Sequence, residues 1–112
     1  MKLADLVPAP QHHAFFDLYA LNRIADCAGC YCLTNANGDI LYVGQAVSVQ
    51  RRLIQHFGSP KRNELTPHGR VSRVSWREEG ALRLSALERG WLETIRLKDG
   101  ALPPLNRVSA PL

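Results

Sequence analysis

The stretch GCYCLTNANGDILYVGQAVSVQRRLIQH, residues 29–56, is the part of the chain around which the rest is organised. Residues 30–34 alternate with the two-residue period of a strand rather than the longer period of a helix. Asn37 and Gly38 tolerate positive φ angles, so we expect a tight turn that reverses the chain into a second strand. Gly44 is expected to end that strand, and the two strands then form a hairpin.

Alternation in the second strand places Ile40 and Tyr42 on one face, and Leu41 and Val43 on the other. Tyr31 of the first strand and Tyr42 are expected to lie in one region.

A short amphipathic helix is predicted over residues 47–57, where Val49, Leu53 and Phe57 form an apolar stripe. His56 falls within this stripe and Arg52 at its edge, whereas Arg51 points to the opposite side. Arg52 and His56 are four residues apart and are therefore neighbours on one helix face. A core histidine and a capping arginine would explain this pair if it stood alone; the two tyrosines beside it favour a functional site.

The tripeptides GCY at 29–31 and YVG at 42–44 resemble the paired tripeptides of the GIY-YIG nuclease family. Members of that family also carry an arginine, often followed four residues later by histidine or tyrosine, which Arg52 and His56 match. The resemblance covers roughly residues 29–106.

Two further motifs extend the resemblance towards the C-terminus. Glu88, within Leu87-Glu88-Arg89-Gly90-Trp91-Leu92, stands where the family carries a glutamate on a later helix, and Asn106 follows Pro103 and Pro104 as in family members. The family implies a small α/β (α+β) fold with a three-stranded antiparallel sheet flanked by helices. Residues 29–112 would form the nuclease domain, and residues 1–28 an N-terminal arm and extra helix packed on it as part of one structural domain.

The resemblance also implies an activity, the hydrolysis of DNA phosphodiester bonds assisted by one Mg²⁺ or Mn²⁺ ion. Glu88 would hold the ion, and Arg52 would neutralise charge on the reacting phosphate. Tyr31 or Tyr42 would act as the general base, with help from Arg52, His56 or the metal because an ordinary tyrosine has a pKa of about 10. Gly29, Gly44 and Asn106 would be structural.

Helical geometry singles out the same glutamate. A helix over residues 81–98 has a buried stripe of Leu84, Leu87, Trp91 and Ile95. Glu88 projects about 40° from the centre of this stripe, whereas Glu93 projects about 180° away. An ionised carboxylate on a buried face needs a cation, which is either the metal or an arginine of the sheet.

Basic residues concentrate in the middle of the chain. The sequence carries a net charge of +4, and seven of its 14 Lys and Arg residues lie between residues 50 and 77, against Glu64 as the only acid. We interpret this as a surface that follows a phosphate backbone. The predicted nucleic-acid contacts are Gln45, Arg51, Lys61, Arg62, Arg70, Arg73 and Arg77. Several of these lie on the loop 58–69 or on a third strand, residues 70–77, whose Ser72, Val74 and Trp76 share one face and whose Val71, Arg73 and Arg77 share a basic one.

The remaining sequence bounds the class of protein. At 112 residues the chain suits one domain, and it shows neither a membrane-spanning run nor a signal peptide, so we expect a cytoplasmic protein without membrane contact. Cys27, Cys30 and Cys32 are odd in number and are expected to be reduced thiols rather than a disulfide framework or a zinc site.

The N-terminal residues lie outside the resemblance. Residues 1–10 are expected to form an extended arm. The dense apolar residues of 12–26 predict a helix packed on the sheet, with His12 and His13 at the surface.

Two alternatives to a nuclease stay open at this stage, a nucleic-acid-binding module without catalysis and a protein-interaction adaptor. The sequence shows no recognition domain, so it leaves open branched, flapped or damaged DNA in repair or recombination, RNA, and targeting by a partner protein.

Overall fold

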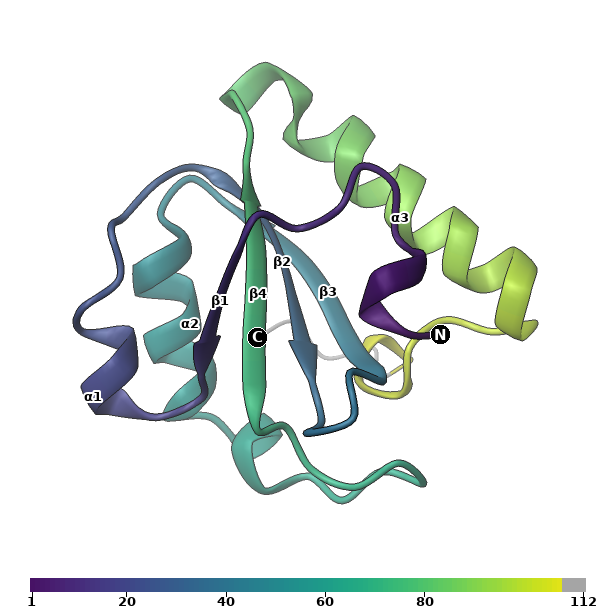
Figure 1. Ribbon diagram of the computed structural model, residues 1–112, viewed down its shortest axis with the longest axis horizontal. Coiled ribbons are helices and arrows are strands. Elements are labelled where there is room, and N and C mark those ends of the chain that lie inside the picture. Colours follow the sequence, from purple (N-terminus) through teal and green to yellow (C-terminus); the bar gives the residue numbers. More distant parts are fainter. Residues whose placement is uncertain (108–112) are drawn as a thin grey trace.

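A central antiparallel sheet organises the computed structural model, which describes residues 1–107. Its four strands lie in the order β1-β4-β2-β3 (Figure 1), so the chain's second hairpin strand is at one edge and an N-terminal strand at the other. The strands are β1 (His12–Phe15), β2 (Gly29–Thr34), β3 (Ile40–Ala46) and β4 (Arg73–Glu78). The mixed α/β class with an antiparallel sheet is confirmed.

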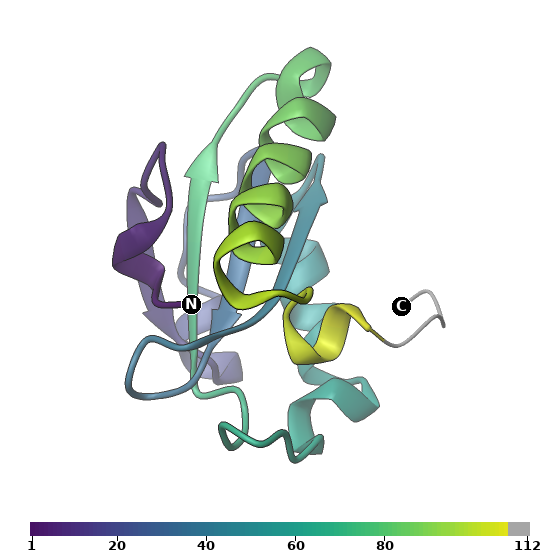
Figure 2. The same ribbon diagram turned by 90° about the vertical axis from the view of Figure 1, so that its right-hand side faces the viewer.

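Helices cover the two faces of this sheet separately (Figures 1 and 2). The helices are α1 (Leu18–Leu21), α2 (Val49–Phe57) and α3 (Leu84–Asp99), and short 3-10 turns are η1 (Leu3–Asp5), η2 (Pro60–Asn63), η3 (Ala81–Arg83) and η4 (Pro104–Asn106). Tyr31 and Leu33 pack with α2 in one core, whereas Cys30 and Cys32 pack with α3 in a second core. We refer to these as the α2 face and the α3 face of the sheet.

The predicted N-terminal helix over residues 12–26 is wrong, and so is the number of three strands. Residues 12–15 instead form strand β1, which pairs antiparallel with β4, and only one helical turn, α1, follows. The Asp17 side chain caps that turn by accepting a hydrogen bond of 2.7 Å from the Ala20 amide. The many apolar residues of this segment suggested a helix. Its first part instead forms a strand, because the backbone N–H and C=O groups along the edge of β4 need hydrogen-bond partners.

A bulge in the hairpin changes the expected faces of β3. The register between β2 and β3 shifts between Leu33 and Thr34, so Leu41 is the extra residue. Ile40 and Val43 consequently lie in the α3 core, and Leu41 in the α2 core, against the predicted pairing of Ile40 with Tyr42. Simple alternation cannot anticipate a bulge, because one inserted residue reverses every side chain beyond it.

Several boundaries also differ from the predicted ones. Strand β3 continues past Gly44 to Ala46, and α2 begins at Val49 because the Ser48 side chain caps it by accepting from the Arg51 amide. The third predicted strand begins later, at Arg73. Val71 therefore lies outside the alternation and is buried in the α2 core instead of on the basic face.

The apolar stripes of the two long helices are as predicted. Val49 and Leu53 of α2 are fully buried, and Trp91 and Ile95 of α3 are buried in the second core. The N-terminal arm adds Leu6 to that second core, and the Trp91 indole donates a 3.0 Å hydrogen bond to the Pro8 carbonyl. Residues 1–10 are thus fixed against the sheet.

Among the residues that the structure describes, none of the helices combines the length and the apolar character needed to cross a membrane. Cys30 and Cys32 are buried free thiols, and Cys27 is a partly exposed one.

Candidate functional site

Tyr31 of β2 and His56 of α2 form a hydrogen-bonded pair inside the protein. The Tyr31 hydroxyl lies 2.7 Å from His56 Nε2, and neither side chain is exposed. Burial lowers the pKa of His56 to about 3, and the charges of Lys61 and Arg52 act in the same direction. The imidazole is therefore neutral near pH 7. Its Nδ1 is buried without a hydrogen-bond partner in residues 1–107, which is uncommon for a buried polar atom.

Tyr42 of β3 covers this pair from the solvent side. Its ring centroid lies 5.0 Å from that of His56 and 6.1 Å from that of Tyr31, and its side chain is only partly buried. Burial raises the pKa of Tyr31 and of Tyr42, and the positive charge of Arg52 opposes the rise in both. Both tyrosines are therefore protonated at neutral pH, and Tyr42 is the one that solvent can reach.

Two glycines make room for this arrangement. A Cβ on Gly44 would lie 2.5 Å from the Tyr31 hydroxyl oxygen, because the two residues face each other across the β2–β3 pair. A Cβ on Gly29 would overlap the Arg77 backbone carbonyl on β4. The glycines of the two tripeptides are thus explained by close approach between neighbouring strands.

Arg52 and Lys61 bring positive charge to Tyr31, Tyr42 and His56, which we call the aromatic cluster. Arg52 lies one helical turn before His56 and is partly buried, whereas Arg51 is exposed on another side of α2. Lys61, on η2 after the helix, holds its Nζ atom 5.1 Å from the Tyr42 ring centroid. The η2 turn is tied to α2 through the Ser59 hydroxyl, which donates to the His56 carbonyl at 2.8 Å. No carboxylate within the described part of the chain forms an ion pair with Arg52 or Lys61.

Glu88 supplies a carboxylate from α3. Burial raises the pKa of Glu88, and the hydrogen bond that the Gln45 amide donates at 3.3 Å opposes this rise. The Glu88 charge raises the pKa of both Tyr31 and Tyr42. Glu93, by contrast, is exposed and pairs with Arg96 at 2.7 Å. In residues 1–107 no basic side chain lies within ion-pair distance of Glu88, so the alternative pairing with a sheet arginine does not occur.

The donor set around Glu88 suits a hard cation that keeps much of its water. Across residues 1–107 no group of three His, Cys, Asp or Glu side chains is placed to enclose a metal. A half-buried carboxylate with no cation beside it matches the way in which Mg²⁺ or Mn²⁺ is held jointly by one acidic residue, water and a substrate phosphate.

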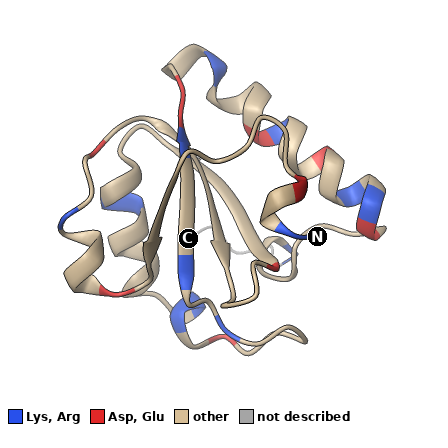
Figure 3. Cartoon of the chain, in the orientation of Figure 1, with Lys and Arg blue, Asp and Glu red and all other residues tan. Residues whose placement is uncertain are grey.

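The predicted nucleic-acid contacts do not share one surface. Lys61 joins the aromatic cluster, and the Arg62 guanidinium stacks on Phe57 at 4.4 Å. Arg73 and Arg77 lie on the α3 face, because they alternate with the buried Val74 and Trp76 of the α2 face. The Arg77 guanidinium donates to the Ala9 carbonyl at 3.0 Å, and its Nε is buried. Basic segments gather where β4 begins and along η2 (Figure 3).

Gln45 and Lys61 contact candidate site residues, which the sequence did not indicate. Gln45, expected only as a nucleic-acid contact, is the hydrogen-bond partner of Glu88. Its position one residue after Gly44 puts it on the face that α3 covers, which was a usable signal. The approach of Lys61 to Tyr42 gave no signal, because it depends on the path of the loop after α2.

Asn106 binds the backbone of edge strand β3. Its side-chain oxygen accepts from the Val43 amide at 2.8 Å, and its side-chain nitrogen donates to the Val43 carbonyl at 2.9 Å. The C-terminal turn η4 thus completes the hydrogen bonding of the strand that carries Tyr42.

Comparison with known proteins agrees with this geometry. UvrABC system protein C of Geobacter metallireducens is 33% identical over 60 residues, which are 54% of this chain and 10% of that protein. The chain therefore corresponds to about a tenth of that relative's length. A family model described as the GIY-YIG catalytic domain matches residues 27–98, which include both tripeptides, Arg52, His56 and Glu88. On this match, over more than half of its length, the chain belongs to the GIY-YIG family of nucleases.

Proposed function

We propose that this protein is a metal-dependent endonuclease that hydrolyses DNA phosphodiester bonds. The observation that carries the proposal is Glu88, a half-buried carboxylate without an ion-pair partner in the described residues, whose charge raises the pKa of Tyr31 and Tyr42. A carboxylate in this setting is costly unless a cation accompanies it.

The Glu88 carboxylate would hold one Mg²⁺ or Mn²⁺ ion, with Gln45 fixing the orientation of one of its oxygens. When bound, such an ion supplies electrostatic stabilisation of the leaving oxygen. Arg52 and Lys61 would bind the phosphate whose charge increases during the reaction, since neither is paired with a carboxylate within residues 1–107.

The attacking water would give its proton to the aromatic cluster. Tyr42 is the tyrosine within reach of solvent, because its side chain is only partly buried. With the proton of the neutral imidazole on Nδ1, Tyr31 would donate to His56 Nε2, so that a proton could pass from water to Tyr42, from Tyr42 to Tyr31, and finally to the imidazole.

Substrate binding would make His56 a better proton acceptor. In the free protein the charges of Lys61 and Arg52 help to lower its pKa to about 3. A phosphate bound between these two cations offsets their charge, so the pKa of His56 rises when the substrate is in place. Proton acceptance by His56 would thus depend on occupancy of the site by substrate.

The test is nicking of supercoiled plasmid in Mg²⁺ or Mn²⁺ by wild type, Glu88→Gln and Arg52→Ala, with Glu93→Gln as the matched control on the same helix. Wild type and Glu93→Gln are expected to give open circles, and Arg52→Ala to lose roughly 100-fold or more in rate. Glu88→Gln should bind DNA in EDTA as wild type does but leave the plasmid intact.

Other outcomes would identify the alternatives. DNA binding by wild type without cleavage of plasmid, branched or single-stranded substrates would indicate a binding module. The absence of binding to DNA or RNA at low salt, where electrostatic binding is strongest, would indicate a protein adaptor. Cleavage that needs an added protein would indicate a targeting partner.

A further inference from the structure

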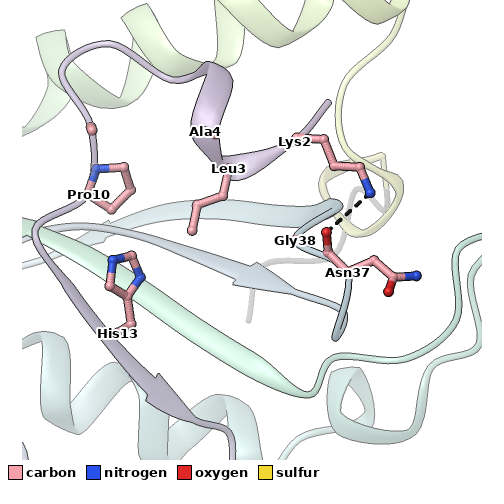
Figure 4. A pocket seen from close by; sticks show the side chains of 8 residues that line it. Lys2, Leu3, Ala4, Pro10, His13, Asn37 and Gly38 are labelled. Carbon is pink, nitrogen blue, oxygen red and sulfur yellow. Dashed lines mark hydrogen bonds between the residues drawn. The ribbon is translucent and has the colours of Figure 1, made fainter.

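A groove opens on the α3 face of the sheet, beside the N-terminal arm (Figure 4). Pro10 and His13 lie on one side of it, and Leu3, Asn37 and Gly38 on the other. Its volume is about 540 Å³, and it continues into a smaller space of about 240 Å³ lined also by Thr34, Arg73 and Ser75.

Strand register places the groove on the other face of the sheet from the aromatic cluster. His13 pairs with Ser75, and Ser75 with Cys32, so their side chains share the α3 face. The next row along the same face is Phe15, Arg73 and Thr34. Helix α3 does not contribute to the lining of this part of the sheet.

His13 is oriented by the floor of the groove. Its Nδ1 lies 2.7 Å from the hydroxyl of Ser75, which is itself buried. This contact fixes the ring and leaves Nε2 as the nitrogen that faces a ligand. The histidine thus offers a positioned polar group between apolar walls.

Arg73 lines the smaller space, and its strand partner Phe15 contacts it from the same face of the sheet. The Arg73 guanidinium lies 5.4 Å from the Phe15 ring centroid, and Phe15 is 62% exposed. Arg73 makes no ion pair with any carboxylate in the described part of the chain, whereas Lys2 at the other end is held by Asp39 at 2.9 Å. An exposed ring beside an available guanidinium is the combination that binds unpaired bases and their phosphates.

We propose that this groove binds an unpaired nucleotide of the DNA substrate, with the base stacked on Phe15 and the phosphate on Arg73 and His13. The proposal rests on the proposed function in that the substrate is DNA. It goes further because it assigns a preference for DNA with a single-stranded segment, such as a flap, to a surface separate from the catalytic cluster.

The experiment measures fluorescence anisotropy of a labelled single strand, a duplex and a flapped duplex with the full chain carrying Glu88→Gln. Phe15→Ala and Arg73→Ala are each expected to weaken single-strand and flap binding roughly tenfold, and duplex binding much less. The matched controls are Tyr19→Ala and Arg23→Ala, because this exposed pair, Tyr19 on α1 and Arg23 just after it, has the same stacked chemistry, with the guanidinium 3.3 Å from the ring.

A second measurement locates the ligand. Addition of the single strand should shift the His13 ring resonances in NMR spectra. Equal losses in the α1 controls, equal losses for duplex, or unmoved His13 resonances would each overturn the proposal. Plasmid nicking by the wild type tests the proposed function independently, so failure of one is distinguished from failure of the other.

Discussion

Substitution of Gly44 by alanine tests how the hairpin builds the site. The added Cβ would lie 2.5 Å from the Tyr31 hydroxyl oxygen and 2.6 Å from the ring carbon that carries it. Tyr31 has few torsions and is fully buried, so its ring cannot move aside without losing the 2.7 Å contact with His56. The new methyl group must therefore displace a rigid side chain in a packed core.

The expected loss of stability has two parts. Overpacking of a core costs about 1–3 kcal/mol, and breaking a buried hydrogen bond costs about 1–3 kcal/mol more, so we expect Gly44→Ala to lower the unfolding free energy by roughly 2–6 kcal/mol. The matched control is Gly90→Ala on α3, where nothing lies within 4 Å of the added Cβ. Alanine should stabilise that helix by up to about 1 kcal/mol.

Urea unfolding followed by tryptophan fluorescence measures both variants, because Trp76 and Trp91 are buried. Plasmid nicking well below the unfolding midpoint then shows whether displacement of Tyr31 also lowers the rate. A Gly44→Ala protein within about 0.5 kcal/mol of wild type, a change typical of surface positions, would refute the account of this glycine.

Three further predictions concern other parts of the structure. Asn106→Ala removes two hydrogen bonds to strand β3 and should lower the unfolding free energy by about 1–3 kcal/mol in urea titrations. An unchanged unfolding midpoint would contradict a stabilising role of these two hydrogen bonds. The lowered pKa of His56 means that the unfolded chain binds a proton that the folded protein does not. Stability is therefore complete above about pH 6.5 and falls towards pH 3, and His56→Gln should flatten this slope, which unfolding at pH 7 and pH 4.5 would reveal. A thiol reagent should label Cys27 in the native protein but Cys30 and Cys32 only after unfolding, because burial raises the pKa of both and covers them; rapid labelling of all three would count against the second core.

Local patterns in the sequence were sufficient where one element carried the information. Two-residue alternation and Asn37-Gly38 predicted the hairpin, and helical spacing placed His56 on the buried face of α2 and separated Glu88 from Glu93. These predictions succeeded because side-chain direction within a strand or helix follows from backbone geometry alone.

Patterns failed where the outcome depended on contacts between distant segments. The apolar run of residues 12–26 looked helical, yet pairing with β4 made its first part a strand. The bulge after Leu33 reversed the faces expected for β3, because a register shift depends on the partner strand as much as on the strand itself.

The sequence by itself determined the hairpin and the two amphipathic helices. It also singled out the candidate site residues, which are Tyr31, Tyr42, Arg52, His56 and Glu88. Only the tertiary structure decided that Tyr31 is hydrogen-bonded to a buried neutral histidine, that Lys61 lies over the Tyr42 ring, and that Arg73 and Arg77 lie on the opposite face of the sheet. The physical reason is that burial and charge at a site are sums over all neighbouring elements. Periodicity describes one element at a time, so it fixes where a side chain points and leaves open what it meets.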